Sequence, residues 1–332
     1  MEISCPQTFD IQSVSGFLNV IEHVKNEPSL TINFGDVQYV YPFPTIVLAQ
    51  ALKNLIRTRS EHRKLETIAS GMAWNSGAIG YLQHFGFFKH IGFGIGKAVD
   101  HSLGGSSYLP LTTIKSSQIM HKGHVMQEEI DIKADRLASV IFPGDKNIGP
   151  AIMLSYALRE IIRNSFEHGG VDKCIAMGQR WYNGDAEIAI ADEGWGVAMS
   201  LGRVMKFDSP KDAVQRALLP GISSRSVTGA GDWDNSGFGL YVVSELGRRY
   251  GEFSIISSGC LLTADNGLKN ISHIQMHGTI VKLKVNTRDA DYFPNILKQI
   301  VTEGEKISES LEGAVRSASK MSKLPVSKTH NQ

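Results

Sequence analysis

The segment ALREIIRNSFEHGG, residues 157–170, places a carboxylate and a carboxamide at a spacing that could serve chemistry. Glu160 and Asn164 are four residues apart, so on a helix they lie one above the other on the same side. A carboxylate there can accept a proton from water, and an amide oxygen one turn away can bind a hard cation. Taken alone, the pair is explained more simply as a surface Glu and Asn on an amphipathic helix.

The neighbouring residues predict the helix that would hold this pair. Apolar side chains recur at roughly helical spacing and could form one core-facing stripe. They are Leu154, Leu158, Ile161, Ile162 and Phe166. The helix is expected to run from Ile148 to His168, with His168 as a helix-end cap before a Gly-Gly pair.

Three later segments carry polar residues and glycines at the ends of predicted strands and helices. Asp192 follows the strand-like run 186–191 and begins the sequence DEGWG. GFGL, residues 237–240, opens an apolar helix, and GT, residues 278–279, leads into a strand at 280–285. Together with the helix pair, the order is E-x-x-x-N, D-x-G-x-G, G-x-G-L and G-T.

These segments suit a purine nucleotide and its phosphates. A buried carboxylate only accepts hydrogen bonds, so Asp192 could pair with the exocyclic amine of adenine but not with the carbonyl oxygen of guanine. Gly194 and Gly196 would let the backbone approach the nucleotide without a Cβ in the way. Free N–H groups and the positive end of a helix dipole after Gly237 and Gly239 favour phosphate.

The four segments, in this order and each on the expected element, resemble the four boxes of the GHKL ATPases. That superfamily includes gyrase B subunits, MutL, a class of heat-shock chaperones, sensor histidine kinases and anti-sigma-factor serine kinases. The resemblance covers roughly residues 125–290. It implies a two-layer α/β sandwich, in which a mixed sheet is covered by helices on one face.

The resemblance also implies a role for each matching residue. Asp192 would read adenine, and Thr279 would reach the base through water. Asn164 would hold Mg²⁺ beside the phosphates of ATP, and Glu160 would orient or deprotonate an attacking water. The other residues of the nucleotide site would be Gly194, Gly196, Gly237, Gly239 and Leu240.

Residues 197–236 form a long segment in which one short helix, Lys211 to Leu219, is predicted. The second half of the segment is rich in Gly and Ser. GHKL relatives carry their ATP lid in this position, and Arg225 within it could reach the γ-phosphate.

The first 115 residues predict a separate small α/β domain. Strands are expected at 30–34 and 65–69, a turn followed by a short strand within 35–40, and helices at 45–57 and 78–88. This layout resembles a STAS domain, the anti-anti-sigma-factor fold.

The tip before the first helix departs from that family. Phospho-acceptor STAS proteins carry a Ser or Thr there, whereas this chain has Tyr41-Pro42-Phe43-Pro44, with Thr45 the only nearby hydroxyl. We therefore expect the tip to pack or to dock a partner and not to accept phosphate.

The bulk composition narrows the function classes. The chain has 332 residues, 42% of them hydrophobic, and a formal net charge of +1. These values are ordinary for a soluble protein and give no global electrostatic case for a nucleic-acid partner. The three cysteines are far apart and form neither a disulfide framework nor a zinc spacing. With no apolar run of about 18 residues, we expect a cytoplasmic protein without a membrane segment.

Three domains are predicted. Residues 1–115 form the STAS-like domain, residues 116–290 the GHKL ATP-binding domain, and residues 291–332 a C-terminal helix with a basic, flexible tail. The interdomain connection is expected between Leu109 and Gln127, and the tail after Gly313 is expected to be solvated.

Two functions follow from the resemblance, and both require Mg-ATP. The first is an enzyme that transfers the γ-phosphate to water or to a partner's Ser or Thr, within a partner-switching regulatory system. The second is a non-catalytic, ATP-gated module whose lid and STAS-like domain dock a partner. A protein partner is expected in either case, and a homodimer is compatible with both.

Overall fold

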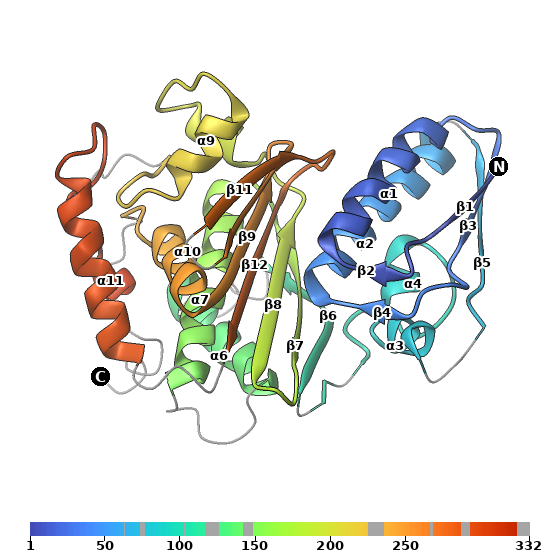
Figure 1. Cartoon of the computed structure of the whole chain (residues 1–332), viewed down its shortest axis with the longest axis horizontal. Coiled ribbons are helices and arrows are strands. Elements are labelled where there is room, and N and C mark those ends of the chain that lie inside the picture. Colours follow the sequence, from blue (N-terminus) through green and yellow to red (C-terminus); the bar gives the residue numbers. More distant parts are fainter. Residues whose placement is uncertain are drawn as a thin grey trace.

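The computed structural model describes residues 1–62, 64–73, 77–102, 104–105, 107–116, 126–141, 149–224, 236–265, 268–286 and 293–323. Within these residues the chain forms two halves, each built on its own main sheet (Figure 1). The N-terminal sheet is parallel, and the larger second sheet is antiparallel. The mixed α/β class expected from the sequence is confirmed at this level.

The N-terminal half has a three-stranded parallel sheet on its outer side, in the order β1-β3-β5 (Figure 1). The strands are β1 (Glu2–Ser4), β3 (Ser29–Asn33) and β5 (Glu66–Ser70), with a short parallel pair of β2 (Thr8–Phe9) and β4 (Tyr39–Val40). The helices are α1 (Ile11–Val24), α2 (Pro42–Arg57), the π-helical turn η1 (Thr58–His62), α3 (Ala78–His84) and α4 (Phe87–Ile91).

Local sequence explains where these helices begin and break. Asp10 Oδ1 accepts a hydrogen bond from the Ser13 N–H at 2.8 Å and so caps the first turn of α1. Pro42 is the first residue of α2, where a missing N–H costs no helical hydrogen bond. The helix predicted at 78–88 is divided into α3 and α4 by Gly86, whose φ of 83° lies in the left-handed region.

The second half is built on a seven-stranded sheet in the order β11-β10-β9-β12-β8-β7-β6. The strands are β6 (Tyr108–Lys115), β7 (Lys173–Arg180), β8 (Asp185–Asp192), β9 (Gly251–Ser257), β10 (Cys260–Asp265), β11 (Leu268–His273) and β12 (Thr279–Asn286). Every pairing among these described strands is antiparallel. The prediction of a mixed sheet is therefore wrong.

Helices cover one face of this sheet. The long helices are α6 (Met126–Ile141), α7 (Gly149–His168), α10 (Gly239–Tyr250) and α11 (Phe293–Ser308), and the short ones are α8 (Val197–Leu201), α9 (Pro210–Ala217) and α12 (Lys320–Lys323). The last of the long helices, α11, packs against α7 and α10. No helix in the described part of the chain is long and apolar enough to cross a membrane.

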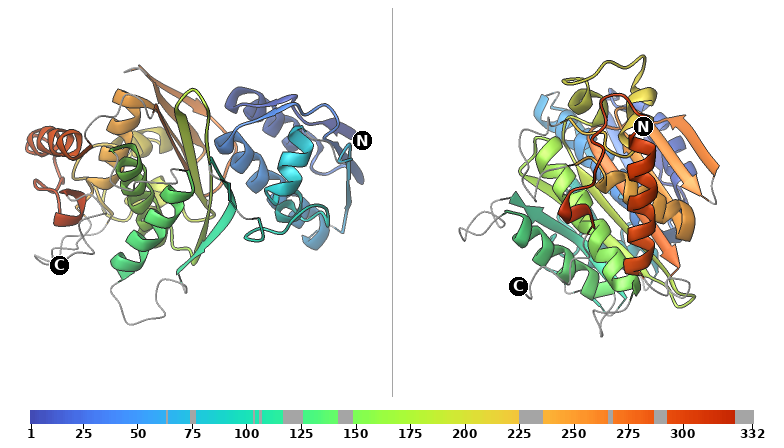
Figure 2. Two further views of the ribbon diagram at one scale, coloured as in Figure 1. Left: turned by 90° about the horizontal axis from the view of Figure 1, so that it is seen from below. Right: turned by 90° about the vertical axis from the view of Figure 1, so that its left-hand side faces the viewer.

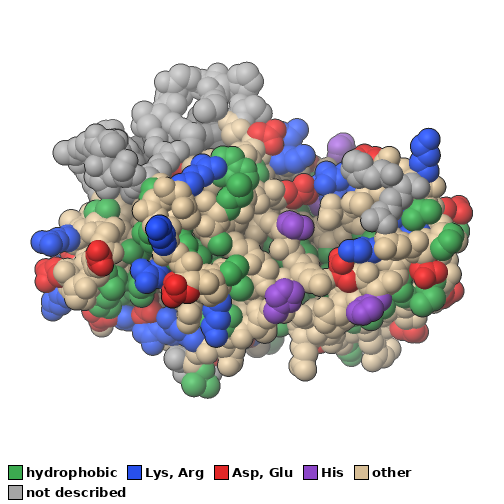
Figure 3. Space-filling model, turned by 90° about the horizontal axis from the view of Figure 1, so that it is seen from above, with side chains coloured by type: hydrophobic (Ala, Val, Ile, Leu, Met, Phe, Trp, Pro, Cys, Tyr) green, Lys and Arg blue, Asp and Glu red, His purple; other side chains and the backbone are tan. Residues whose placement is uncertain are grey.

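The N-terminal half covers the opposite face of the seven-stranded sheet, chiefly through α2 (Figure 2). Alternate residues of β8 point into two different cores. Ala186, Ile188 and Ile190 belong to the core with α7 and α10, whereas Ala189 and Ala191 belong to the core with α2. The prediction of helices on one face only is thus incomplete, because the sheet is buried on both faces. The two halves meet along a seam that is visible from above (Figure 3).

Strand β6 also corrects the predicted connection between the halves. The segment from Leu109 to Gln127 was expected to link two domains, but most of β6 lies in it and pairs with β7 at the edge of the second sheet. The strand lies just before the predicted boundary at residue 115, yet it belongs to the sheet that follows the boundary.

The chain after Gly313 is packed as far as residue 323. The Val315 N–H donates to the carbonyl of Gly221 at 2.8 Å, and Ser322 is fully buried. The prediction of a solvated tail is therefore wrong for Ala318 and Ser322, which are buried, whereas Arg316, Ser317 and Lys323 are exposed. Residues 324–332 lie outside the described residues.

A carboxylate of the seven-stranded sheet holds the N-terminus of α2. Glu187 of β8 is only 5% exposed, and its Oε1 accepts a hydrogen bond from the Phe43 N–H at 2.9 Å. Thr45, two residues further into α2, is 0% exposed. The tip at residues 41–44 therefore packs against the second half, and Thr45 is shielded from any phosphate donor.

Burial raises the pKa of Glu187, although Lys282 and the Phe43 N–H oppose this rise. Because the pKa is raised in the folded state, this carboxyl stabilises the fold most when it is protonated, below its unfolded pKa of about 4.3. The contribution is lost as pH rises through the folded pKa.

We predict that Glu187→Gln keeps or increases the free energy of unfolding at pH 7, since the amide oxygen still accepts from Phe43 and carries no charge. Glu187→Ala leaves that N–H unpaired and should cost about 1–3 kcal/mol. Chemical denaturation at pH 5 and pH 8 measures both variants against the parent. An alanine variant as stable as the parent would show that this hydrogen bond does not matter.

Candidate functional site

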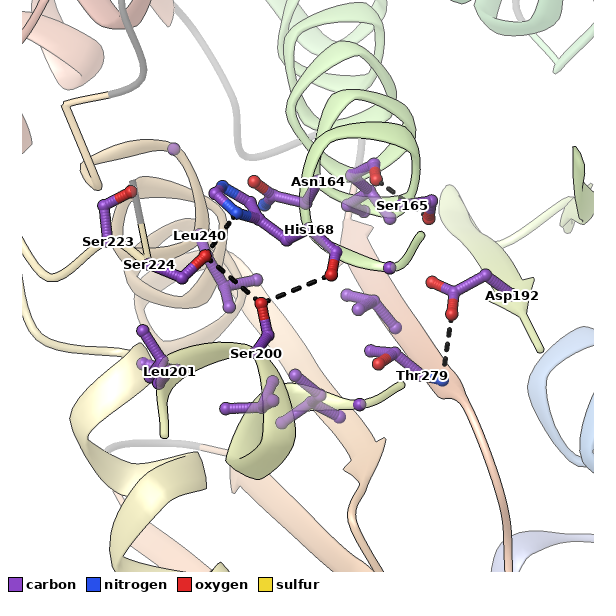
Figure 4. A pocket seen from close by; sticks show the side chains of 18 of the residues that line it. Asn164, Ser165, His168, Asp192, Ser200, Leu201, Ser223, Ser224, Leu240 and Thr279 are labelled. Atoms are coloured by element: carbon purple, nitrogen blue, oxygen red, sulfur yellow. Dashed lines mark hydrogen bonds between the residues drawn. The ribbon is translucent and has the colours of Figure 1, made fainter. Parts of the chain in front are cut away.

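Asp192 ends β8 at the mouth of the seven-stranded sheet, where it pairs with Thr279 of β12 and Cys174 of β7. Its side chain is 4% exposed, and Oδ1 accepts hydrogen bonds from the N–H groups of Gly194 at 2.9 Å and Thr279 at 3.3 Å (Figure 4). Burial raises the pKa of Asp192, and hydrogen bonds from Gly194, Ser165 and Thr279 partly offset the rise. The strand end thus presents a desolvated carboxyl in a fixed orientation.

A cavity opens beside Asp192 between α7, the sheet and the first turn of α10 (Figure 4). Seven of the nine predicted site residues line this cavity, namely Asn164, Asp192, Gly196, Gly237, Gly239, Leu240 and Thr279. The other two, Glu160 and Gly194, are not part of its lining. The structure therefore brings together residues from four separate stretches of the sequence.

Three hydrogen bonds join the elements at the other end of the cavity (Figure 4). The Ser224 hydroxyl contacts His168 Nδ1 at 2.6 Å and Ser200 Oγ at 3.2 Å, and Ser200 Oγ donates to the His168 carbonyl at 3.2 Å. They connect the end of α7 with α8 and with the segment after α9. The cavity has a volume of about 90 Å³, well below the roughly 300–1,000 Å³ of pockets that hold drug-sized ligands.

The N-terminus of α10 faces this cavity through Gly239 and Leu240. Phe238 at the N-cap makes no side-chain hydrogen bond to the first turn, so the cap leaves the helical N–H groups without a side-chain acceptor there. Gly239 is required for packing, because a Cβ at this position would collide with the carboxylate of Glu160. The glycine therefore allows α10 to approach α7 closely, a reason that the sequence alone did not indicate.

Glu160 lies behind this turn in a buried cluster of charges. Its Oε1 accepts from Arg159 Nε at 3.0 Å and Nη2 at 2.9 Å, and its Oε2 forms an ion pair with Arg163 at 3.0 Å. Asp131 of α6 approaches Arg159 at 3.8 Å, and these four side chains are at most 1% exposed. Burial lowers the pKa of Arg159. The nearby carboxylates of Glu160 and Asp131 raise this pKa by more than burial lowers it, so the net shift is upward. The carboxylate is thus committed to two guanidinium groups.

The oxygen atoms around the cavity suit a metal ion that enters together with a ligand better than a metal ion held by the protein alone. Among the described residues, no group of three or more His, Cys, Asp or Glu side chains is arranged to hold a metal ion. Asn164 lines the cavity and supplies one amide oxygen. Mg²⁺ suits such a site because it keeps several waters and shares substrate phosphates. Arg225, predicted to reach the γ-phosphate, lies outside the described residues.

Sequence reasoning predicted the hydroxyl of Thr279 but missed the serine hydroxyls of the cavity. Ser165, Ser200 and Ser224 all line it, and they come from α7, α8 and the segment after α9. Only Ser165 had a detectable signal, since it follows Asn164 directly. The other two belong to no motif, and only the folded chain brings them to His168.

No protein-family model matches this chain, and no curated protein matches its sequence.

We predict that Glu160→Gln lowers the free energy of unfolding by about 3–5 kcal/mol, because it removes the carboxylate that lies nearest to two buried guanidinium groups. Glu22→Gln on α1 is the matched control, since Glu22 pairs with Lys25 at the surface, with side chains 39% and 41% exposed. That exposed pair should contribute at most about 1 kcal/mol. If urea denaturation gave the same loss of unfolding free energy for Glu160→Gln and Glu22→Gln, the buried cluster would not stabilise the fold more than a surface pair does.

Proposed function

We propose that this protein binds Mg-ATP in a GHKL-type site and that its N-terminal half is a STAS-like domain docked on the back of the nucleotide-binding sheet. The observation that carries the proposal is the buried carboxyl of Asp192. It lies at a strand end and lines the same cavity as Asn164 and the first turn of α10. A site for adenine, a cation and phosphate needs these three groups around one space.

Asp192 suits the recognition of adenine because both of its backbone hydrogen bonds go to the same carboxyl oxygen. One oxygen is engaged by two backbone N–H groups, which fix the carboxyl. The ionised carboxyl accepts hydrogen bonds and donates none, so it favours the exocyclic amine of adenine. A site that requires such a polar contact can reject the wrong ligand strongly. Thr279 and Ser165 next to it offer hydroxyl groups to the base or to a bridging water.

The phosphates would lie at the start of α10. This helix has 12 residues, and its first turn lines the cavity. Backbone N–H groups and the helix dipole attract anions at such a position. Asn164 on α7 would add one oxygen to the shell of a Mg²⁺ ion held by the phosphates.

ATP would also need space that the closed cavity lacks. The contacts of His168 with Ser224 and Ser200 would have to open to admit a nucleotide. Binding would therefore be coupled to movement of the segment that begins after α9, and this coupling suits a module that signals its nucleotide state to a protein partner. A second copy of the chain would serve as such a partner in a homodimer.

The geometry of Glu160 favours an ATP-gated binding module over hydrolysis or phosphoryl transfer. A general base must lie within hydrogen-bond reach of the proton it takes. Glu160 does not line the cavity, and both of its oxygens face arginines. For transfer to water, or to the hydroxyl of a partner in a partner-switching system, Glu160 would first have to leave these ion pairs.

We predict that Asp192→Asn binds Mg-ATP about 10- to 100-fold more weakly, because a charge-assisted hydrogen bond is lost while an acceptor for the Gly194 N–H remains. ATP affinity of the parent should also fall as pH falls through the raised pKa of Asp192. Isothermal titration calorimetry with ATP and GTP measures both effects. Asp265→Asn, at the exposed end of β10, is the control and should change nothing. Equal affinity of the parent and Asp192→Asn would refute the adenine assignment.

We predict that Asn164→Ala weakens ATP binding in Mg²⁺ but has little effect in EDTA, whereas Asn270→Ala on the exposed strand β11 has no effect in either. In a phosphate-release assay the parent should be no faster than Asn164→Ala, as a binding module requires. Release by the parent that disappears in Asn164→Ala would instead identify an ATPase.

A further inference from the structure

A second cavity, of about 850 Å³, lies between the two halves. One wall is made by α1, α2 and η1, and the other by the loop after β8 and by residues 273–278 before β12. Its volume falls within the roughly 300–1,000 Å³ that is typical of small-molecule sites. Basic, acidic and His side chains all lie near the middle of the face seen in Figure 3.

The charge of this cavity is positive. Four basic side chains line it, and they are Lys25, Lys53, Arg57 and Arg59. Two carboxylates, Glu22 and Glu193, face them. Four positive charges against two negative ones leave +2 from the Lys, Arg and Glu side chains of the lining. An anion is therefore the ligand that this cavity attracts.

The two ion pairs that line this cavity are weak enough for a bound anion to replace their carboxylates. Lys25 pairs with Glu22, and Lys53 with Glu193 at 2.7 Å, and all four side chains are 28–45% exposed. Exposed pairs of this kind stabilise a protein by at most about 1 kcal/mol. A ligand with two or more negative charges can take over the lysines at low cost. Arg57, on the exposed side of α2, contributes a further cation.

The side-chain oxygen of Gln50 adds a polar atom to this cavity. The Gln50 side chain is 6% exposed and lines the cavity, and its Oε1 is buried without a hydrogen-bond partner among the described residues. A buried acceptor without a donor is unfavourable. A ligand that brings an O–H or N–H group would satisfy it.

We propose that the cavity between the two halves is a second ligand site, which takes a small polyanion carrying a hydrogen-bond donor. Phosphate and carboxylate groups share this chemistry. The site is distinct from the candidate nucleotide cavity, because the two have no lining residue in common.

The polyanion site is also coupled to the nucleotide cavity, and this part rests on the proposed function. The loop after β8 serves both sites, since Asp192 lines one and Glu193, Gly194 and Trp195 line the other. Lys53 ties Glu193 to α2, and the Gly194 N–H orients the carboxyl of Asp192. An anion that displaces Glu193 from Lys53 frees this loop and changes ATP affinity, and ATP changes anion affinity by the same factor.

Calorimetric titration of the full chain with inorganic pyrophosphate, and separately with citrate, tests the site and distinguishes phosphate from carboxylate. Lys53→Gln/Arg57→Gln should weaken binding of the preferred anion by about tenfold or more. The double variant Lys211→Gln/Lys269→Gln, which removes two exposed lysines on α9 and β11, should bind like the parent. Unfolding midpoints of both variants check that the fold is retained.

Three outcomes would overturn the site: no binding of either anion, an equal loss in both double variants, or a loss in Asn164→Ala with none in Lys53→Gln/Arg57→Gln. The coupling is tested by measuring ATP affinity with and without saturating anion. The anion should change the ATP affinity of the parent but not that of Lys53→Gln/Arg57→Gln. An unchanged ATP affinity in the parent would refute the coupling. If the parent binds the anion but not ATP, the proposed function fails while the polyanion site stands.

Discussion

Strand β8 is buried on both faces, and the two halves of the molecule and the candidate site all depend on its register. Ile188 and Ile190 enter the core under α7, whereas Ala189 and Ala191 face α2. A shift of one residue would exchange these two sets and direct isoleucines at α2. It would also turn Glu187 away from α2 and move Asp192 from its place opposite Thr279.

The shared core joins the N-terminal half to the seven-stranded sheet. Interfaces between independent domains are usually modest and polar, but here the back of the sheet and the N-terminal half form one continuous apolar cluster. This shared core means that a signal between the halves has to pass through local elements, of which the loop with Glu193 and Trp195 is the best placed.

The buried ion pairs on α7 affect both the stability of the fold and the availability of Glu160 for proton transfer. Arg159 and Arg163 form ion pairs with the buried carboxylate of Glu160. These ion pairs place an arginine against each of the two oxygens that a general base would use. A carboxylate at the expected position in a motif can therefore have a structural role, and its neighbours decide which role it has.

The sequence by itself determined the local elements and most of the candidate site. Helical periodicity predicted α7, an alternating run predicted β8, and Asp192, Asn164 and Gly239 were singled out because short-range patterns govern strand ends, helix faces and turns. The tertiary structure alone decided the antiparallel strand order, the place of β6, the packing of residues 313–323 and the burial of both faces of the sheet. It alone decided also that Arg159, adjacent to Glu160 in sequence, turns toward it. Such contacts depend on how distant segments pack, and no local pattern records which segments will meet.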